Sequence, residues 1–159
     1  MILAFDHGAV RELRLNRRPV NALTGELMVA LRQAIEAAPQ QGVRALILSG
    51  TPGRFSGGLD VPLLLTLERP AIAAVWRELY ALLKALAASP IPIAAAVTGH
   101  SPAGGTVLAL FCDFRVMAQG DSRSDSTRCK LGFRCPLLFC LDSGDWWARV
   151  RRSAWLSAV

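Results

Sequence analysis

The chain has 159 residues, of which 52% are hydrophobic and 19% are charged, so it can bury a core and is not a disordered chain. Its formal net charge is +6, but most of the basic excess follows Asp121 and no predicted helix interleaves Lys and Arg with aromatic residues. We therefore expect one domain that binds no nucleic acid. The apolar stretches carry Pro, Lys or Glu and are too short to span a bilayer, so we expect no membrane partner.

The four cysteines have spacings that fit no zinc site: Cys112, Cys129, Cys135 and Cys140. We interpret them as free thiols of a reducing compartment and expect no metal. The N-terminal stretch MILAFDHG lacks the basic segment and the long apolar run of a signal peptide. These features predict a cytoplasmic protein.

The first third of the chain predicts a hairpin, a helix and a buried strand. Residues 2–6 and 10–15 alternate in polarity around the dipeptide HG, which favours a β-hairpin. Thr24 is a candidate N-cap for an amphipathic helix over residues 25–38. A leucine and isoleucine run at 44–50, ended by glycine, predicts a buried strand.

Helices and strands then alternate as far as Asp121. A long apolar helix is expected over 71–88, and two prolines end it before a strand at 93–97. The stretch GGTVLALFCD predicts another helix, and FRVMA predicts another strand. This alternation is typical of an α/β layered domain.

Two glycine pairs lie between a predicted strand and a predicted helix, in RFSGGLDV (54–61) and in SPAGGT (101–106). Free backbone N–H groups point outward at such places, and glycine lets a ligand approach them closely. If the two loops converge, one N–H from each would hydrogen-bond a single carbonyl oxygen and form an oxyanion hole. The alternative is that both are ordinary tight turns.

Four stretches occur in the order LNRRPVNAL, GVRALILSG, RFSGGLD and IPIAAAVTGHSPAGGTVLALFCDFRVMA. Together they resemble the enoyl-CoA hydratase/isomerase family, or crotonase superfamily, over nearly all of residues 1–121. The resemblance implies an α/β fold, a spiral of ββα units whose helical C-terminal part supports trimers. It also implies an acyl-CoA substrate, with coenzyme A as part of that substrate and no separate cofactor.

The resemblance also implies the site residues. Matched position by position, the backbone amides of Leu59 and Gly104 would form the oxyanion hole, and residues 59–62 would line the path of the thioester and pantetheine. The further substrate contacts implied are Ser56, Gly57, Gly58, Asp60, Val61, Pro62 and Gly105. From the residues alone, Asp60 is better interpreted as a structural or loop-capping carboxylate.

The chain departs from the family where proton transfer needs a base. Hydratases place a glutamate three positions after the glycine that matches Gly104, and Val107 stands there. Isomerases use a glutamate further on, in a stretch resembling GLNE, which is missing here. After Asp121 the sequence loses every helical or strand period. We therefore expect a core over 1–121, an aberrant, poorly ordered tail over 122–159, and a fold that lacks the C-terminal helical part.

A shifted reading frame would explain the tail. Taking the last base of each codon with the first two of the next, from Asp121 onward, allows FKIGLNEVQVG, and later QRRLVG from the codons of residues 142–148. One pyrimidine lost near the Asp121 codon would produce this result. The catalytic glutamate of the parent would then stand near Thr127 and Arg128.

The expected activity of the parent is double-bond isomerisation of an acyl-CoA through an enolate held by the oxyanion hole. We expect this chain, without either glutamate, to be inactive, because the proton-transfer group contributes about 10²- to 10⁴-fold. One alternative is an inactive acyl-CoA binder or an unstable truncated product, and another is an interaction module that uses the basic tail.

The GHSPA stretch nearly matches a nucleophile elbow at Ser101, but a hydrolase needs a histidine downstream, and only His7 and His100 are present. We expect His100 to be a loop residue packed beside the pocket.

Overall fold

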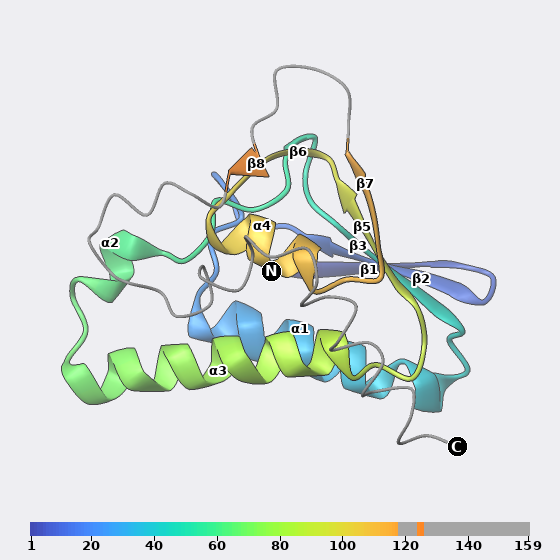
Figure 1. The fold of residues 1–159 in the computed structure, drawn as a ribbon, viewed down its shortest axis with the longest axis horizontal. Helices are drawn as coiled ribbons and strands as arrows, with labels where there is room; N and C mark the ends of the chain where they lie inside the picture. Colours follow the sequence, from blue (N-terminus) through green and yellow to red (C-terminus); the bar gives the residue numbers. More distant parts are fainter. Residues whose placement is uncertain (118–123, 126–159) are drawn as a thin grey trace, which may run out of the picture.

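The computed structural model describes residues 1–117 and 124–125 (Figure 1). Apart from β8, the predicted tail over 122–159 lies outside the described residues. The elements are β1 (Ile2–His7), β2 (Val10–Leu15), α1 (Gly25–Ala37), a 3-10 turn (Pro39–Gln41), β3 (Ala45–Ser49), β4 (Gly53–Arg54), α2 (Val61–Leu64), α3 (Arg69–Ala87), β5 (Ile93–Val97), β6 (Gly99–Pro102), α4 (Gly104–Leu110), β7 (Phe114–Met117) and β8 (Ser124–Asp125).

The strands form two sheets, and the chain alternates between them after β3. The larger sheet has the order β1-β2-β3-β5-β7, with β1 and β2 antiparallel and every later pair parallel. The smaller sheet has the order β4-β6-β8 and is parallel. The predicted hairpin is confirmed, since His7 pairs with Val10 across its turn. The predicted strands at 44–50 and 93–97 are confirmed as β3 and β5.

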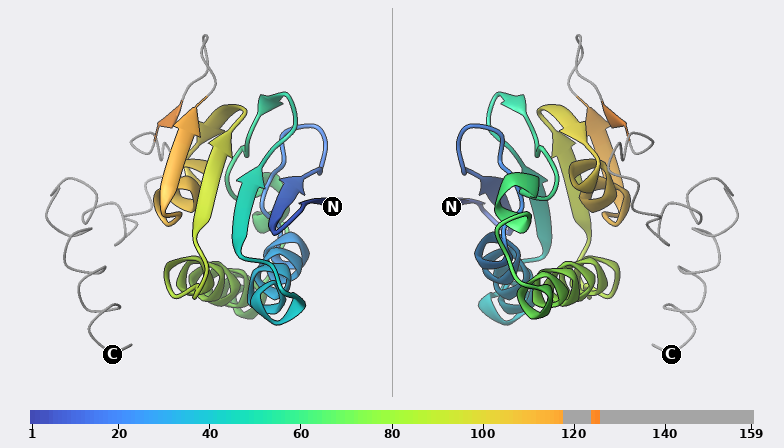
Figure 2. Two further views of the ribbon diagram at one scale, coloured as in Figure 1. Left: turned by 90° about the vertical axis from the view of Figure 1, so that its right-hand side faces the viewer. Right: turned by 90° about the vertical axis from the view of Figure 1, so that its left-hand side faces the viewer.

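Two helices cover one side of the large sheet. Helices α1 and α3 contact each other and lie side by side below the strands (Figures 1 and 2). Thr24 caps α1 as predicted, because its Oγ1 accepts the Leu27 N–H at 3.3 Å. Helix α3 begins at Arg69, two residues before its predicted start, with Pro70 in its first turn, where no intrahelical N–H is required. The inward faces of both helices are leucine-rich.

The core lies between these helices and the large sheet. Its largest fully buried side chains are Phe55, Leu15, Leu23, Leu27, Met28, Leu31, Leu46, Leu48, Leu82, Ile93, Leu108 and Asn21. The one polar side chain among these buried residues, Asn21, lies beside the first glycine loop.

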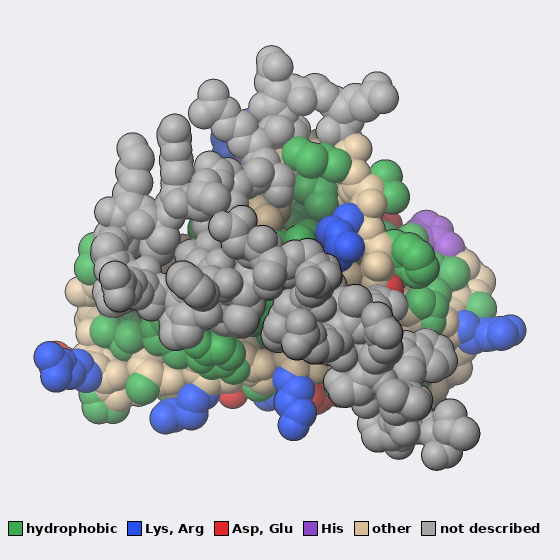
Figure 3. Space-filling model, in the orientation of Figure 1, with side chains coloured by type: hydrophobic (Ala, Val, Ile, Leu, Met, Phe, Trp, Pro, Cys, Tyr) green, Lys and Arg blue, Asp and Glu red, His purple; other side chains and the backbone are tan. Residues whose placement is uncertain are grey.

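Lys and Arg side chains project along the lower edge of the molecule, beneath α3 (Figure 3).

The small sheet was missed by the sequence analysis, which placed GHSPA in a loop. Strand β6 forms there because Gly53 pairs with Gly99 and Arg54 with His100. The two glycines are in such close contact that a Cβ on Gly99 would lie 2.0 Å from the Gly53 carbonyl carbon. Glycine is therefore required where the two strands touch. Within the described part of the chain, no helix is long and apolar enough to cross a membrane.

Candidate active site

The first glycine loop, residues 55–60 (loop 1), is fixed by a segment that runs beside it, residues 20–23. The Leu23 N–H donates to the Gly58 carbonyl at 2.7 Å, and the Leu23 carbonyl accepts the Asp60 N–H at 3.1 Å. This is a short parallel bridge between the two segments. Backbone hydrogen bonds thus hold loop 1 on both sides of Leu59, at Gly58 and at Asp60.

The amides on either side of Leu59 are all used inside the fold. The Gly57 N–H donates to the Val20 carbonyl at 2.7 Å, and the Gly58 N–H donates to the Ser56 Oγ at 3.2 Å. Gly58 has a φ of +82°, a left-handed conformation that favours glycine. This turn directs the next amide away from the supporting segment. Among the described residues, nothing accepts the Leu59 N–H.

Two buried side chains hold loop 1 from behind. Ser56 is fully buried, and its Oγ also donates to the Asn21 carbonyl at 2.8 Å. Asn21, at a φ of 53°, donates through Nδ2 to the carbonyls of Arg54 and Phe55, each at 3.1 Å, and to Thr51 Oγ1 at 3.2 Å. The hydroxyl of Ser56 therefore supports the loop, and its expected contact with substrate stays a prediction.

The second glycine loop, residues 102–105 (loop 2), leads from β6 into α4. Ala103 has a φ of 49° and a ψ of −116°, a strained conformation for a residue with a side chain. Behind it, a Cβ on Gly105 would lie 2.4 Å from the Ser56 carbonyl oxygen and 2.9 Å from the Ser101 Oγ. Gly105 therefore allows loop 2 to pack directly on loop 1, and its expected contact with substrate stays a prediction.

The two loops converge at Gly58 and Gly104. A Cβ on Gly104 would lie 3.1 Å from the Gly58 Cα and 3.3 Å from the Leu59 nitrogen. The N–H of Gly104, like that of Leu59, has no acceptor among the described residues. The structure thus brings together the two amides that the sequence analysis selected. Two unpaired neighbouring N–H groups are what a developing oxyanion requires.

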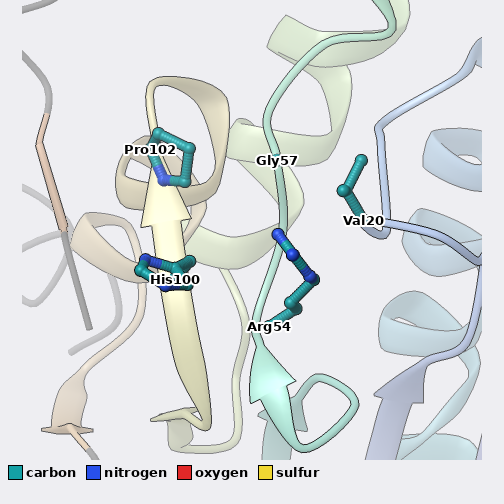
Figure 4. A pocket seen from close by; sticks show the side chains of 5 residues that line it. All are labelled: Val20, Arg54, Gly57, His100 and Pro102. Carbon is teal, nitrogen blue, oxygen red and sulfur yellow. The ribbon is translucent and has the colours of Figure 1, made fainter. Parts of the chain in front are cut away.

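A pocket of about 450 Å³ opens beside these loops (Figure 4). Its lining residues are Val20, Arg54, Gly57, His100 and Pro102. Of the residues predicted to contact substrate, only Gly57 belongs to this lining. His100 lies beside the pocket as expected, but on strand β6 rather than in a loop.

The remaining predicted contacts lie at the start of α2. Asp60 accepts the Leu63 N–H at 3.2 Å and pairs with the Arg17 guanidinium at 2.8 Å. It is therefore a helix cap with its own counter-charge, which agrees with the structural interpretation. Val61 and Pro62 form the first turn of α2. Their contact with a pantetheine chain stays a prediction.

Two residues bear on the alternative chemistry. Val107 lies in α4 and is partly buried against the core. Because its side chain is aliphatic, this position carries no proton-transfer group. Ser101 is fully buried, and no described atom hydrogen-bonds its Oγ. A nucleophile must be reachable and activated by a base, so the structure gives no support to a hydrolase.

The described residues hold no group of three or more His, Cys, Asp or Glu side chains that could bind a metal ion. Cys112, which follows α4 in the chain, is fully buried, and burial raises the pKa of its thiol to about 12. It is a structural thiol and not a nucleophile. The other three cysteines, and the positions of Thr127 and Arg128, lie outside the described residues.

A family model for enoyl-CoA hydratase/isomerase matches residues 6–140. The chain belongs to this family. Enoyl-CoA delta isomerase 1 of mouse mitochondria is 36% identical over 111 residues, which make up 69% of this chain and 38% of the mouse protein. A probable enoyl-CoA hydratase, EchA17 of Mycobacterium tuberculosis H37Rv, is 36% identical over 146 residues, or 89% of this chain and 52% of that protein.

Solved structures of the enoyl-CoA hydratase/isomerase family share the fold. Human mitochondrial delta3-delta2-enoyl-CoA isomerase matches with a TM-score of 0.72 and 29% identity, over 76% of this chain and 48% of the human chain. A family protein from Pseudomonas syringae matches with a TM-score of 0.78 and 26% identity, over 84% of this chain and 57% of that one. The crotonase-like α/β fold is therefore confirmed, and it is incomplete.

This enoyl-CoA hydratase/isomerase family chain spans about half the length of the curated relatives it matches. The family model runs past Asp121 to residue 140. The division into a core over 1–121 and a tail over 122–159, and the shifted reading frame, stay predictions.

Three residues that shape the site were not selected from the sequence: Val20, Asn21 and Leu23. They lie in the stretch LNRRPVNAL, which the sequence analysis used only to support the resemblance. One signal was present, because asparagine tolerates the left-handed conformation and bonds to backbone groups. That signal alone does not say which loop the asparagine supports.

Proposed function

We propose that this chain binds an acyl-CoA thioester and holds its carbonyl oxygen on the N–H groups of Leu59 and Gly104. The reaction of the intact parent would be isomerisation of an enoyl-CoA double bond, through removal of a proton beside the carbonyl and its return elsewhere. The relatives support this proposal, since they are named as enoyl-CoA isomerases and hydratases.

The observation that carries the proposal is the pair of unpaired amides where the loops meet. In loop 1, hydrogen bonds within the fold use the N–H groups of Gly57, Gly58 and Asp60 but not that of Leu59. The Gly104 amide lies beside it across the contact with Gly58. Each such donor is worth about 3 to 4 kcal/mol to an oxyanion, because it is fixed before charge develops.

The same site lacks a carboxylate where the family's hydratases carry one. Val107 is an aliphatic side chain and cannot accept a proton. The chain would therefore stabilise an enolate without generating one efficiently. We expect little or no hydratase or isomerase turnover, which makes an inactive acyl-CoA-binding protein the second candidate function.

An enolate that forms without enzymic help tests the oxyanion hole separately from proton transfer. Acetoacetyl-CoA ionises in water, and its enolate has its own ultraviolet absorption. Titration of this thioester with the chain is expected to increase the enolate band at fixed pH, since both amides bind the oxyanion more tightly than the neutral carbonyl. A saturating titration that leaves the enolate band unchanged, or no binding at all, contradicts the proposal.

Gly104→Ala is the matched variant. Its Cβ would press on the Gly58 Cα and on the Leu59 nitrogen and so separate the two amides. The enolate band is expected to fall toward that of the free thioester. Gly25→Ala is the control, because a Cβ there meets nothing within 4 Å. Turnover of an enoyl-CoA by the unmodified chain would show that the missing glutamates are not required.

A further inference from the structure

The pocket beside the oxyanion loops has a basic wall for which the proposed function gives no role. Arg54 on β4 and His100 on β6 both line it, with the apolar side chains of Val20 and Pro102 (Figure 4). Among the described residues, the lining contains no Asp or Glu. A ligand in this pocket therefore meets the Arg54 guanidinium in a wall that has no described acidic side chain.

The sheet places the two basic residues on one face. Arg54 and His100 are direct partners in the parallel register of β4 and β6. The next residues, Phe55 and Ser101, point inward and are fully buried. Because side chains alternate along a strand, Arg54 and His100 both face outward. They project into the same pocket from neighbouring strands (Figure 4).

The Arg54 side chain is free to bind a ligand. Its backbone is fixed, since its N–H donates to the Thr51 carbonyl at 2.9 Å and its carbonyl accepts from Asn21 Nδ2 at 3.1 Å. Its guanidinium makes no hydrogen bond or ion pair with any other described residue. A guanidinium presents a planar fork of donors that matches a carboxylate in a bidentate contact.

The distance along the chain favours a group close to the thioester. Arg54 lies four residues before Gly58, about 13 Å at most at the rise of an extended strand. Its side chain extends toward Gly57 (Figure 4), which shortens the distance from its guanidinium to loop 1. The phosphates of coenzyme A lie at the far end of the pantetheine arm from the thioester. A carboxylate a few bonds beyond the carbonyl, on the acyl group, suits this position better.

We infer that the pocket of Arg54 and His100 binds a carboxylate on the acyl group, so that short dicarboxylic acyl thioesters are the preferred ligand class. This inference rests on the proposed function, because it assumes that the thioester carbonyl is held by Leu59 and Gly104. It adds a specificity residue, Arg54 on β4, to the two backbone amides.

Calorimetric titration with succinyl-CoA, butyryl-CoA and coenzyme A tests the inference, since the two acyl groups have the same number of carbons. Succinyl-CoA is expected to bind more tightly than butyryl-CoA. Arg54→Gln is expected to weaken succinyl-CoA by about tenfold or more, the usual effect of losing a hydrogen bond to a charged group, and to leave butyryl-CoA unchanged. Arg44→Gln is the control, because Arg44 is exposed at the opposite end of β3 and the charge change is the same.

The remaining outcomes separate this inference from the proposed function. If Arg54→Gln lowers the affinity for all three ligands equally, the arginine binds coenzyme A phosphates, and the inference is overturned. Equal affinity of the unmodified chain for succinyl-CoA and butyryl-CoA would also overturn it, while binding of butyryl-CoA would leave the proposed function standing. His100→Gln gives a second test, with a smaller selective loss for succinyl-CoA expected.

Discussion

The Cα of Gly58 lies against the amide nitrogen of Gly104, so closely that a Cβ on Gly58 would lie 2.9 Å from that nitrogen. Two loops that follow different strands of the small sheet therefore meet through backbone atoms alone. The site is built by the main chain, and side chains act mainly by supporting it or by being absent. This explains why the sequence places glycine at 57, 58, 104 and 105.

Gly105→Ala is expected to separate the loops. The new Cβ would lie 2.4 Å from the Ser56 carbonyl oxygen, a backbone atom that cannot move without moving loop 1. We expect the free energy of unfolding to fall by about 2 kcal/mol, as for an overpacked core, and acyl-CoA affinity to be lost. Urea denaturation and calorimetry measure the two effects. If Gly105→Ala behaves like the unobstructed Gly25→Ala control, the close packing of the loops is wrong.

Asn21 is expected to be the most sensitive polar side chain of the site. Asn21→Gly keeps the left-handed backbone but removes the donors to the Arg54 and Phe55 carbonyls, which should cost about 2 to 3 kcal/mol. Asn21→Asp should lower the free energy of unfolding further, because a carboxylate oxygen would replace the donor group and face those two carbonyl oxygens. Urea denaturation measures the stability, and acyl-CoA titration measures the site.

Asn16→Gly serves as the control, since Asn16 is an exposed residue at the end of the hairpin. Its effect on acyl-CoA affinity should be small. An Asn21→Gly chain that keeps both its stability and its affinity would show that loop 1 needs no support from behind.

Regular elements were predictable from the sequence because their signals are local. Thr24 as a cap and the strand at 93–97 follow from residue type and spacing. The glycine loops were predictable as candidates, and their convergence required the resemblance. The small sheet was not predictable, because β4 has two residues and its pairing depends on Gly53 meeting Gly99 at long range. The support from Asn21 was missed for the same reason.

Glu12 is expected to make the fold sensitive to acid. Its side chain is 14% exposed, and a hydrogen bond from Arg14, with a second from Ser49, lowers the pKa of its carboxyl below the ordinary value of 4.5. A lowered pKa in the folded state contributes stability above pH 4.5 that is lost as the pH falls through the lowered value. The free energy of unfolding of Glu12→Gln should therefore be about 1 to 2 kcal/mol lower than that of the unmodified chain at neutral pH.

The difference between the Glu12→Gln variant and the unmodified chain should shrink as the pH is lowered from about 5 to about 3. Urea denaturation across this range measures it. Glu68→Gln, at an exposed residue whose side chain does not cap α3, is the control and should show no such convergence. A constant difference for Glu12→Gln at every pH would contradict the assignment.

Cys112 is expected to resist alkylation in the folded chain. Its thiol is buried, donates to the Leu108 carbonyl at 3.4 Å and has its pKa raised to about 12 by burial, so it forms almost no thiolate at neutral pH. Treatment with iodoacetamide and peptide mapping should find residue 112 unmodified until urea is added. Equal labelling in native and denatured chains would mean that α4 does not cover it.

The outer edge of β7 is expected to drive self-association. Every described strand of the large sheet after β2 is added beside the previous one, and no described strand covers the outer edge of β7. Phe114 is 65% exposed and Val116 is 69% exposed there. An uncovered apolar edge strand pairs readily with other chains, and a lysine on such an edge opposes this pairing.

Val116→Lys should therefore lower light scattering and shift sedimentation toward the monomer, with butyryl-CoA affinity unchanged. Gln33→Lys adds the same charge to the exposed side of α1 and should change neither reading, so equal improvement in both variants would assign the effect to net charge and not to the β7 edge.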